Sequence, residues 1–335
     1  MRLAVAVGAL YLAFIGEDFR RVIKLLFGLN LWVFAASLLL YFVSQMIFVG
    51  RWYMLLKVQS IEIGFWAAMR LNFLGLFYNN FLPGSVGGDF LRAWYVTKHT
   101  PKRLEAVLSV FVDRFIGIMG LLLMAFACYW FLPSGGIGQG QTGQGRGGFS
   151  FTQVIIDYRW FLIVIALILA VGLLVLLATK KGRGLLVRGD SFIRQHGLAA
   201  ISKARTAVNI YRGKKLALFW ALLMTLACQG IFVVSLWLLG TNLGATAHIK
   251  HYLVFFPVSW LIGLIPVSIG GTGIVELWLK NAFIQTCAMP GETALALALC
   301  QRLLWVVGSL PGAVIHMLGA HLPKDFSIDE DVTVK

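Results

Sequence analysis

Two short polar stretches stand between long apolar runs: PGSVGG at 83–88, within NNFLPGSVGGDFLR, and PVSIGG at 266–271, within GLIPVSIGGTGIVE. Proline removes a backbone donor and paired glycines permit φ/ψ values closed to other residues, so each stretch is expected to interrupt a helix. In hydrocarbon, such an interruption is stable only where protein or a water-filled cavity covers it. We therefore predict that these two stretches, the first and second breaks, form the walls of a binding site.

The composition is that of an integral membrane protein. The 335 residues are 59% hydrophobic with a mean hydropathy of +0.83, and several apolar runs approach the roughly 20 residues that span a bilayer. The formal charge of +15 does not indicate nucleic-acid binding, because the basic residues cluster between apolar runs as in cytoplasmic loops. The cysteines and histidines lack metal-binding spacings, so neither a metal nor a cofactor is predicted.

The hydrophobic pattern predicts an all-α polytopic protein of the cell (inner or plasma) membrane. Six segments have the length and composition of full transmembrane helices: 2–16, 29–49, 104–132, 158–179, 216–240 and 293–320. Segments 62–92 and 251–288 each contain a break and are expected to form re-entrant hairpins or pairs of broken helices. No A-x-A cleavage site follows the first span, so we expect it to be retained, with a cleaved signal peptide as the alternative.

Loop charges predict the orientation. The segment from Lys180 to Lys215 carries ten basic residues and one acid, whereas the Gly/Gln-rich linker 133–157 carries one basic residue. The positive-inside rule therefore places the basic loop in the cytoplasm and the linker outside. An association of the basic loop with an anionic leaflet explains its charge equally well.

The same rule fixes the remaining segments. The basic stretch around Arg51 and Lys57 and the stretch around Lys102 are expected in the cytoplasm, together with both termini and the tail 321–335. Hairpin 62–92 then enters and leaves on the cytoplasmic face, and hairpin 251–288 on the outer face.

Two matches in the same order indicate an internal repeat. The breaks lie 183 residues apart, and AVLSVFVDRFIGIMG, with Arg114, matches ALALALCQRLLWVVG, with Arg302, at an offset of 188. Units 1–132 and 158–320 would each comprise span, span, broken hairpin and span, so the second unit crosses the membrane inverted. Inverted repeats are typical of secondary transporters, which bind substrate at the repeat interface. Chance recurrence in apolar sequence is the alternative, but it does not explain the shared Pro, Ser and Gly pair.

Polar and ionisable residues near the breaks form the candidate site. A charge at bilayer depth costs roughly 2.5 to 3.5 kcal/mol on insertion scales, so each needs a partner or a ligand. Asp89 and Arg92 share a helical face and can pair. Asp113 could pair with Arg114 or Arg302, and Glu276 is the other candidate partner of Arg302. The predicted substrate-binding residues are Arg70, Asn80, Ser85, Gly87, Gly88, Asp89, Arg92, Asp113, Arg114, Ser268, Gly270, Gly271, Glu276 and Arg302.

The candidate residues favour an anionic ligand because they contain more bases than acids. Guanidinium forks match phosphate oxygens, and helix N-termini at Gly-rich breaks add backbone donors. We therefore expect the partner to be a membrane lipid with an anionic head group. For any single residue, a structural ion pair that fixes helix register is the alternative to ligand contact.

At these residues the sequence resembles the flippase-like family typified by the transmembrane region of lysylphosphatidylglycerol synthase, over nearly the whole chain. The resemblance is carried by Arg70, Asn80, Pro83, Gly84, Gly87, Gly88, Asp89, Arg92, Asp113, Arg114, Gly117, Pro266, Gly270, Gly271, Gly273, Glu276 and Arg302. It implies a lipid-translocation domain, best known as the flippase for aminoacylated phosphatidylglycerol. Unlike the bifunctional members, these 335 residues contain no soluble aminoacyl-transferase domain, so the lipid which that domain makes is not inferred as the substrate.

Three functional hypotheses follow from these observations. The first is a flippase or transporter, without covalent chemistry, for an anionic or zwitterionic lipid such as a phospholipid or a polyprenyl-phosphate-linked lipid. The second is a membrane-embedded transferase acting on a lipid phosphate, with Asp89 or Glu276 as the base, although no nucleotide loop or metal cluster accompanies it. The third is an accessory subunit of a lipid-pathway enzyme. Transport direction, ion coupling and homo-oligomer formation stay open.

Overall fold

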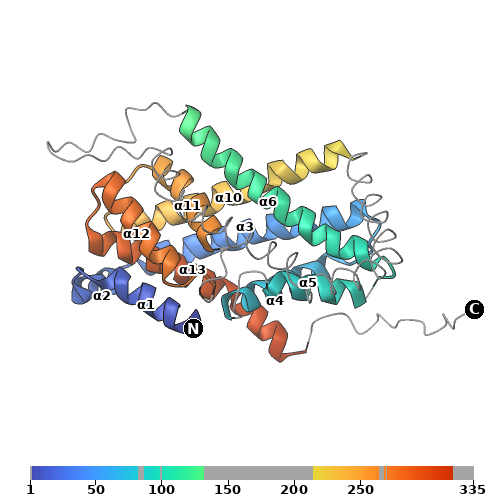
Figure 1. Ribbon diagram of the computed structural model, residues 1–335, viewed down its shortest axis with the longest axis horizontal. Coiled ribbons are helices and arrows are strands. Elements are labelled where there is room, and N and C mark those ends of the chain that lie inside the picture. Colours follow the sequence, from blue (N-terminus) through green and yellow to red (C-terminus); the bar gives the residue numbers. More distant parts are fainter. Residues whose placement is uncertain are drawn as a thin grey trace, which may run out of the picture.

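The computed structural model describes residues 2–81, 87–98, 100–131, 214–263, 268 and 270–319, and every regular element in these ranges is a helix. This confirms the all-α prediction. The helices, labelled in Figure 1, are α1 (Arg2–Phe14), α2 (Phe19–Phe27), α3 (Leu31–Val58), α4 (Phe65–Phe81), α5 (Gly87–Lys98), α6 (Arg103–Phe131), α10 (Lys215–Asn242), α11 (Ile249–Gly263), α12 (Ile274–Cys287) and α13 (Gly291–Met317).

Four of the described helices are long and apolar enough to cross a bilayer: α3, α6, α10 and α13. They coincide with the spans predicted at 29–49, 104–132, 216–240 and 293–320. The expected first span, 2–16, forms the shorter helix α1. Its apolar part, Val5–Phe14, is shorter than the four long apolar helices. The predicted span 158–179, the linker 133–157, the basic loop up to residue 213 and the tail 321–335 lie outside the described residues.

The charged and apolar faces of the long helices are arranged as in a protein surrounded by lipid. On α6, Phe111 and Phe115 are 68% and 64% exposed, whereas Asp113 between them is fully buried. Large apolar side chains also cover the outer faces of α3 and α10. Polar groups at bilayer depth must find partners inside the protein, so this inverted distribution is the one expected for membrane-spanning helices.

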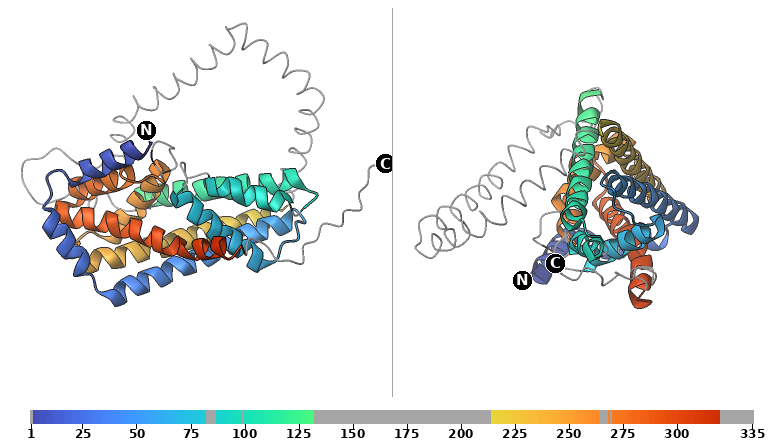
Figure 2. Two further views of the ribbon diagram at one scale, coloured as in Figure 1. Left: turned by 90° about the horizontal axis from the view of Figure 1, so that it is seen from below. Right: turned by 90° about the vertical axis from the view of Figure 1, so that its right-hand side faces the viewer.

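The two predicted broken segments each form two short helices. α4 ends at Phe81 and α5 begins at Gly87, and α11 ends at Gly263 with α12 beginning at Ile274. Figures 1 and 2 show the α4/α5 pair toward one end of the long axis and the α11/α12 pair toward the other. Close packing holds α4 against α5, because a β-carbon at Gly88 would lie only 1.9 Å from the Gly75 carbonyl oxygen.

The second break lies directly against the end of α4. Gly270 has a left-handed φ of +56°, and a β-carbon there would lie 3.2 Å from the carbonyl oxygen of Asn79 and 3.4 Å from that of Asn80. Only glycine combines this conformation with so close a backbone approach. The second break is therefore packed against the end of α4, the helix that precedes the first break.

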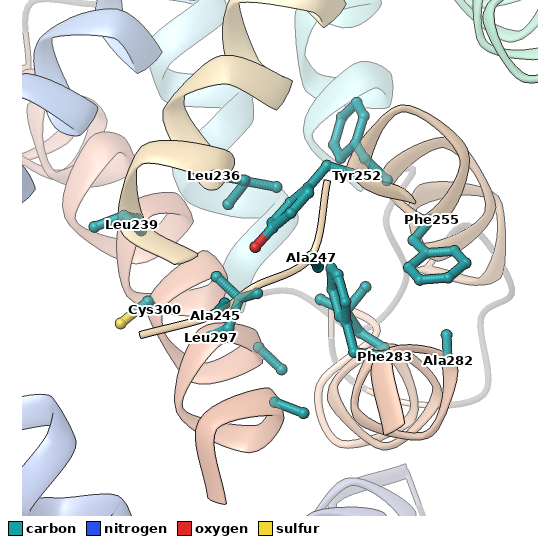
Figure 3. Packing of buried hydrophobic residues seen from close by; sticks show 14 of the residues in the cluster. Leu236, Leu239, Ala245, Ala247, Tyr252, Phe255, Ala282, Phe283, Leu297 and Cys300 are labelled. Atoms are coloured by element: carbon teal, nitrogen blue, oxygen red, sulfur yellow. The ribbon is translucent and has the colours of Figure 1, made fainter. Parts of the chain in front are cut away.

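Two apolar clusters fix the helices around the breaks. The larger one, shown in Figure 3, joins α10, α11, α12 and α13 through side chains such as Leu236, Tyr252, Phe255, Phe283 and Leu297. The smaller one packs α3, α4, α5 and α6 around the buried Trp52. Between the clusters, α3 and α10 pack side by side, and Ser37 and Ser235 each donate a hydroxyl hydrogen bond to the other's carbonyl oxygen.

The N-terminal helices are anchored by a buried lysine. Lys280 on α12 donates to the carbonyl oxygen of Ala13, 2.8 Å away, and its ammonium lies 2.7 Å from the carboxylate of Glu17. A cation at the last carbonyls of a helix satisfies orphan acceptors and suits the helix dipole. Lys280 thus binds the C-terminal end of α1 and the short connection to α2. The sequence analysis did not predict α2, which is an amphipathic helix.

The structure corrects one interpretation of a basic residue. Arg51 was assigned to a cytoplasmic basic stretch, but α3 continues to Val58 and the Arg51 side chain is 1% exposed. That assignment is wrong because Asp113 on α6 compensates the charge, which lets an arginine occupy the interior of a long apolar helix.

The Gly75–Gly88 approach gives the first prediction. Gly88→Ala places a methyl group against the α4 backbone, which cannot yield as a side chain would, so we expect a loss of about 1 to 3 kcal/mol of stability, the usual cost of overpacking. Gly230→Ala on α10 is the matched control, because a β-carbon there meets no atom within 4 Å. Thermal unfolding in detergent, followed by tryptophan fluorescence, compares the two. Equal midpoints would contradict the close packing of α4 on α5.

Candidate functional site

A cavity of about 200 Å³ lies where the two broken segments meet. Helices α3, α4, α5, α6, α10, α11 and α13 contribute to its wall together with Gly270 of the second break. Six of the predicted site residues line it: Asn80, Asp89, Arg92, Asp113, Arg114 and Gly270. Residues far apart in the sequence are therefore brought to one buried space between the breaks.

Arg51 and Asp113 form the deepest ion pair of the cavity wall. The Arg51 guanidinium lies 2.9 Å from Asp113 Oδ1 and donates at 2.6 Å to the Thr225 hydroxyl. A third bond from Arg51 Nη2 reaches the Asp113 carbonyl oxygen at 3.2 Å. Every nitrogen of the Arg51 side chain is bonded within the protein, so this pair ties α3, α6 and α10 together.

Asp89 is shared by two other arginines. Arg114 Nη2 donates to Asp89 at 2.6 Å, and Arg92 Nη1 donates to the same carboxylate at 3.3 Å. The predicted pair of Asp89 with Arg92 is confirmed. Asp113 pairs with Arg51, and lies 3.9 Å from Arg92 Nη2, instead of pairing with Arg114 or Arg302 as the sequence suggested.

Two arginines of the cavity wall each have guanidinium nitrogens without a hydrogen-bond acceptor. Arg92 Nε and Nη2 and Arg114 Nε have no hydrogen-bond partner among the described residues, although Arg92 Nη2 lies 3.9 Å from Asp113 Oδ2. Arg92 is held in place by the ring of Trp52, whose centroid is 4.0 Å from the guanidinium carbon. Buried donors of this kind are costly unless a ligand or water completes them.

The cavity wall is also electrostatically unbalanced. Arg51, Arg92 and Arg114 line it opposite Asp89 and Asp113, which leaves one positive charge in excess among the described lining residues. The lining also includes the aromatic residues Phe232, Phe256, Trp260 and Trp305. The cavity therefore combines ionised and aromatic side chains, and Arg114 lies over the ring of Trp260.

A separate ion pair lies at the second break. Arg302 Nε lies 2.5 Å from Glu276 Oε1, and Arg302 Nη1 donates to the Gly270 carbonyl oxygen at 2.9 Å. The other Glu276 oxygen accepts from the Gly273 amide at the start of α12, 2.6 Å away. Of the two partners expected for Arg302, Glu276 is the one found. Arg302 Nη2 has no hydrogen-bond partner among the described residues.

Paired asparagines join the first break to the remaining helices. The Asn79 side chain accepts from the Gly88 amide at 2.8 Å and so caps the N-terminus of α5. Asn80 donates to the Trp305 carbonyl oxygen of α13 at 3.1 Å. The end of α4 is thereby fixed to α5 and α13, which both contribute to the cavity wall.

Some predicted site residues do not line the cavity. Arg70 is half-buried on α4 and Gly271 is packed against Gly263. Ser268 is buried, with no hydrogen-bond partner for its hydroxyl among the described residues. Gly87 and Gly88 form the first residues of α5 next to Asp89, and Ser85 lies outside the described residues.

Sequence reasoning missed part of the wall. Arg51, Gln229 and the aromatic residues Trp260 and Trp305 were not predicted as site residues. Arg51 could have been found, because the apolar run continues on both sides of it. No group of three His, Cys, Asp or Glu side chains that could hold a metal occurs in the described part of the chain.

The buried Arg51–Asp113 pair gives the second prediction. Arg51→Met leaves the buried Asp113 carboxylate short of its main partner, so we expect a loss of about 3 to 5 kcal/mol of stability. The double variant Arg51→Met, Asp113→Leu should recover most of that loss, because no charge is then left uncompensated. Arg21→Met is the control, since the ion pairs of this exposed residue are worth at most about 1 kcal/mol. Thermal unfolding that placed Arg51→Met beside Arg21→Met would contradict the assignment.

Comparison with known proteins agrees with this architecture. The chain matches the family described as the lysylphosphatidylglycerol synthase TM region over residues 1–312. A UPF0104 membrane protein of Methanocaldococcus jannaschii is 23% identical over 322 residues, covering 92% of this chain and 90% of the relative. A UPF0104 membrane protein of Pyrococcus horikoshii is 20% identical over 313 residues, covering 88% and 90%. The protein is thus a multi-pass membrane protein, and it belongs to the lysylphosphatidylglycerol synthase transmembrane-region family.

Proposed function

We propose that the protein is a lipid flippase or transporter that holds the head group of a phospholipid or polyprenyl-phosphate-linked lipid in the cavity between the two breaks. The observation that carries the proposal is the set of buried Arg92 and Arg114 nitrogens without protein acceptors, inside a bundle of membrane-spanning helices. The family description, which names the membrane region of a lipid-synthesising protein, also favours a lipid ligand.

The size of the cavity suits a head group better than a whole lipid. Pockets that enclose drug-sized ligands have volumes of about 300 to 1,000 Å³, whereas this cavity has about 200 Å³. The acyl or prenyl chains would therefore remain in the bilayer, next to the aromatic wall at Trp260 and Trp305. A head group that enters protein while its chains stay in lipid can change leaflets without exposing its charge to hydrocarbon.

The ion pairs at the two breaks support the proposed inverted repeat. Asp89 follows the first break and binds Arg114 of the next long helix, 25 residues on. Glu276 follows the second break and binds Arg302 of the next long helix, 26 residues on. Equivalent pairs at equivalent places are expected if both units descend from one ancestral unit, as in transporters built from inverted repeats.

We further propose that both termini are cytoplasmic, with residues 133–157 outside. Two lysines in the last turns of α3 and α5 support this orientation: Lys57 lies over the ring of Tyr53 and Lys98 over that of Trp94. Aromatic residues are enriched at both membrane surfaces, whereas lysines next to helix ends are enriched on the cytoplasmic side. Asp113 lies ten residues into α6, about 15 Å from the start of that helix at 1.5 Å per residue, which is close to the middle of a hydrocarbon core about 30 Å thick.

Cysteine labelling in intact cells checks the orientation. In a background with the native cysteines replaced, we expect a cysteine at residue 140 to react with an impermeant reagent and one at residue 200 to react only after lysis. The reverse pattern would overturn the proposed topology.

Replacement of Arg302 tests the transporter proposal. Arg302→Lys keeps the charge, but one ammonium cannot replace the two separate nitrogens that bind Glu276 and the Gly270 carbonyl, so we expect roughly tenfold slower lipid movement. Arg302→Gln should be slower still, and the exposed Arg21→Gln should match the wild type.

The measurement is the transbilayer movement of a fluorescent phospholipid in proteoliposomes, detected by chemical quenching of the outer leaflet. Wild-type rates for both folded Arg302 variants would remove Arg302 from the transport site. An accessory-subunit role would be favoured if the wild type itself moved no lipid, yet still bound lipid-pathway enzymes.

A further inference from the structure

The short helix α2 carries a surface that neither the candidate site nor the proposed function uses. It connects α1 to α3 at one end of the bundle, and Figures 1 and 2 show it running across that end instead of along α3. We infer that α2 lies in the plane of the membrane surface, where Arg20 and Lys24 bind the head groups of anionic phospholipids. The inference does not depend on the lipid movement proposed above, because the described lining of the cavity includes no residue of α2.

The sequence of α2, FRRVIKLLF, separates its side chains into three faces. At 3.6 residues per turn, residues four apart lie close to one line along the helix. An apolar stripe, a basic face and a protein-facing side follow in turn around the axis. They consist of Phe19, Ile23 and Phe27; of Arg20, Arg21 and Lys24; and of Val22, Leu25 and Leu26, respectively.

The protein-facing side fixes the orientation of α2. Val22 is fully buried, and Leu25 and Leu26 pack against the larger apolar cluster. Arg21, next to this side, lies 3.4 Å from Glu292 at the start of α13. Because α2 cannot turn about its axis without exposing Val22, the apolar stripe and the remaining basic residues stay directed away from the bundle.

The apolar stripe faces outward at the end of the bundle. Phe19 and Phe27 are 60% and 87% exposed, and Trp32 in the first turn of α3 is 84% exposed. Removing large aromatic side chains from water is favourable, and such residues are enriched where membrane proteins meet lipid head groups. A helix with an apolar stripe beside a basic face is the pattern of helices that lie in the membrane surface. The stripe therefore contacts the outer part of the acyl chains, and the basic face contacts the head groups.

Two cations on the basic face have no counter-ion among the described residues. The nearby acids are engaged: the Glu17 carboxylate lies 2.7 Å from the Lys280 ammonium, and Asp18 accepts from the Arg20 amide at the start of α2. The side chains of Arg20 and Lys24 are exposed and form no ion pair within the described part of the chain. Exposed basic residues beside a membrane are attracted to anionic lipids, which supply the missing counter-charge.

The proposed orientation does not by itself explain these charges. With a cytoplasmic N-terminus, α1 leads to the outer face, so α2 lies there before α3 returns. The positive-inside rule predicts few basic residues in so short an outer segment. Lipid binding at that face accounts for basic residues which the rule leaves unexplained.

Fluorescence quenching in liposomes tests the inference on the full-length protein. Leu31→Cys, in a background with the native cysteines replaced, places a fluorophore beside α2 without changing any of its three faces, because Leu31 is exposed. The quenchers are phosphatidylglycerol and phosphatidylcholine with a nitroxide at the same position near the start of one acyl chain, each at a low mole fraction in phosphatidylcholine vesicles. We expect phosphatidylglycerol to be enriched at the fluorophore by roughly fivefold or more, since each basic residue at a membrane surface contributes about that factor. Equal quenching by the two lipids would overturn the inference.

Charge variants assign the lipid preference to α2. Arg20→Gln with Lys24→Gln should abolish the enrichment, whereas the exchange Arg20→Lys with Lys24→Arg keeps both charges and should retain it. Lys214→Gln with Lys215→Gln removes the same charge from exposed residues at the start of α10 and should leave the enrichment unchanged. Because all four residues are exposed, we expect the three double variants to keep the wild-type unfolding midpoint. An enrichment that persisted in the folded Arg20→Gln, Lys24→Gln protein would contradict the assignment.

Two further measurements separate lipid binding from other roles of this surface. The reaction of a cysteine at residue 140 with an impermeant reagent should be the same with and without Arg20→Gln, Lys24→Gln. A reversed labelling pattern would make the two charges a topology signal and contradict lipid binding. Energy transfer between donor- and acceptor-labelled copies, with quenching by neither lipid, would assign the surface to a second copy of the protein and overturn the inference.

Discussion

The need to compensate charge in a medium without water governs the centre of this protein. Five ionised side chains line one small cavity, and each aspartate is placed so that it serves more than one arginine. These pairs connect α3, α5 and α6, and Thr225 extends the connection to α10. Because an uncompensated charge in hydrocarbon is costly, the helices can separate only by breaking these contacts.

The two breaks give the network access to a ligand. Each break ends one helix and begins another near the centre of the bundle, so helix termini and side-chain charges meet at the same place. Asn79 caps α5 and Glu276 caps α12, and Gly270 allows the second break to rest on the end of α4. Glycine at these contacts brings backbones close enough for one cavity to be shared by both halves of the chain. The same contacts would have to rearrange for a head group to pass from one leaflet to the other.

Much of this arrangement could be predicted from the sequence, because its signals are local. Apolar runs identified the four long described helices, proline and paired glycines located the breaks, and the spacing of Asp89 and Arg92 identified an ion pair. Asp113 and Glu276 were the two acids expected as partners of Arg302, and Glu276 is the partner found. Family resemblance, which covers the same residues, is confirmed by the match over residues 1–312.

What could not be predicted depends on tertiary contacts. The apolar run on both sides of Arg51 indicates an arginine inside a helix, but its partner Asp113 follows only from a tertiary contact. The aromatic wall of Trp260 and Trp305 carries no signal of its own in sequence already rich in aromatic residues. Lys280 follows Glu276 by one helical turn, yet it binds Glu17 and the end of α1, a contact between opposite ends of the chain.

The central claim is that both breaks enclose one site for a lipid phosphate. A cryo-electron microscopy structure of the protein in nanodiscs containing phosphatidylglycerol tests it most directly. The account predicts phosphate density bonded to Arg92 and Arg114, with Gly270 of the second break at the cavity wall and the lipid chains leading out beside Trp260. A cavity filled by protein side chains, or a lipid phosphate bound only at the surface and away from both breaks, would contradict it.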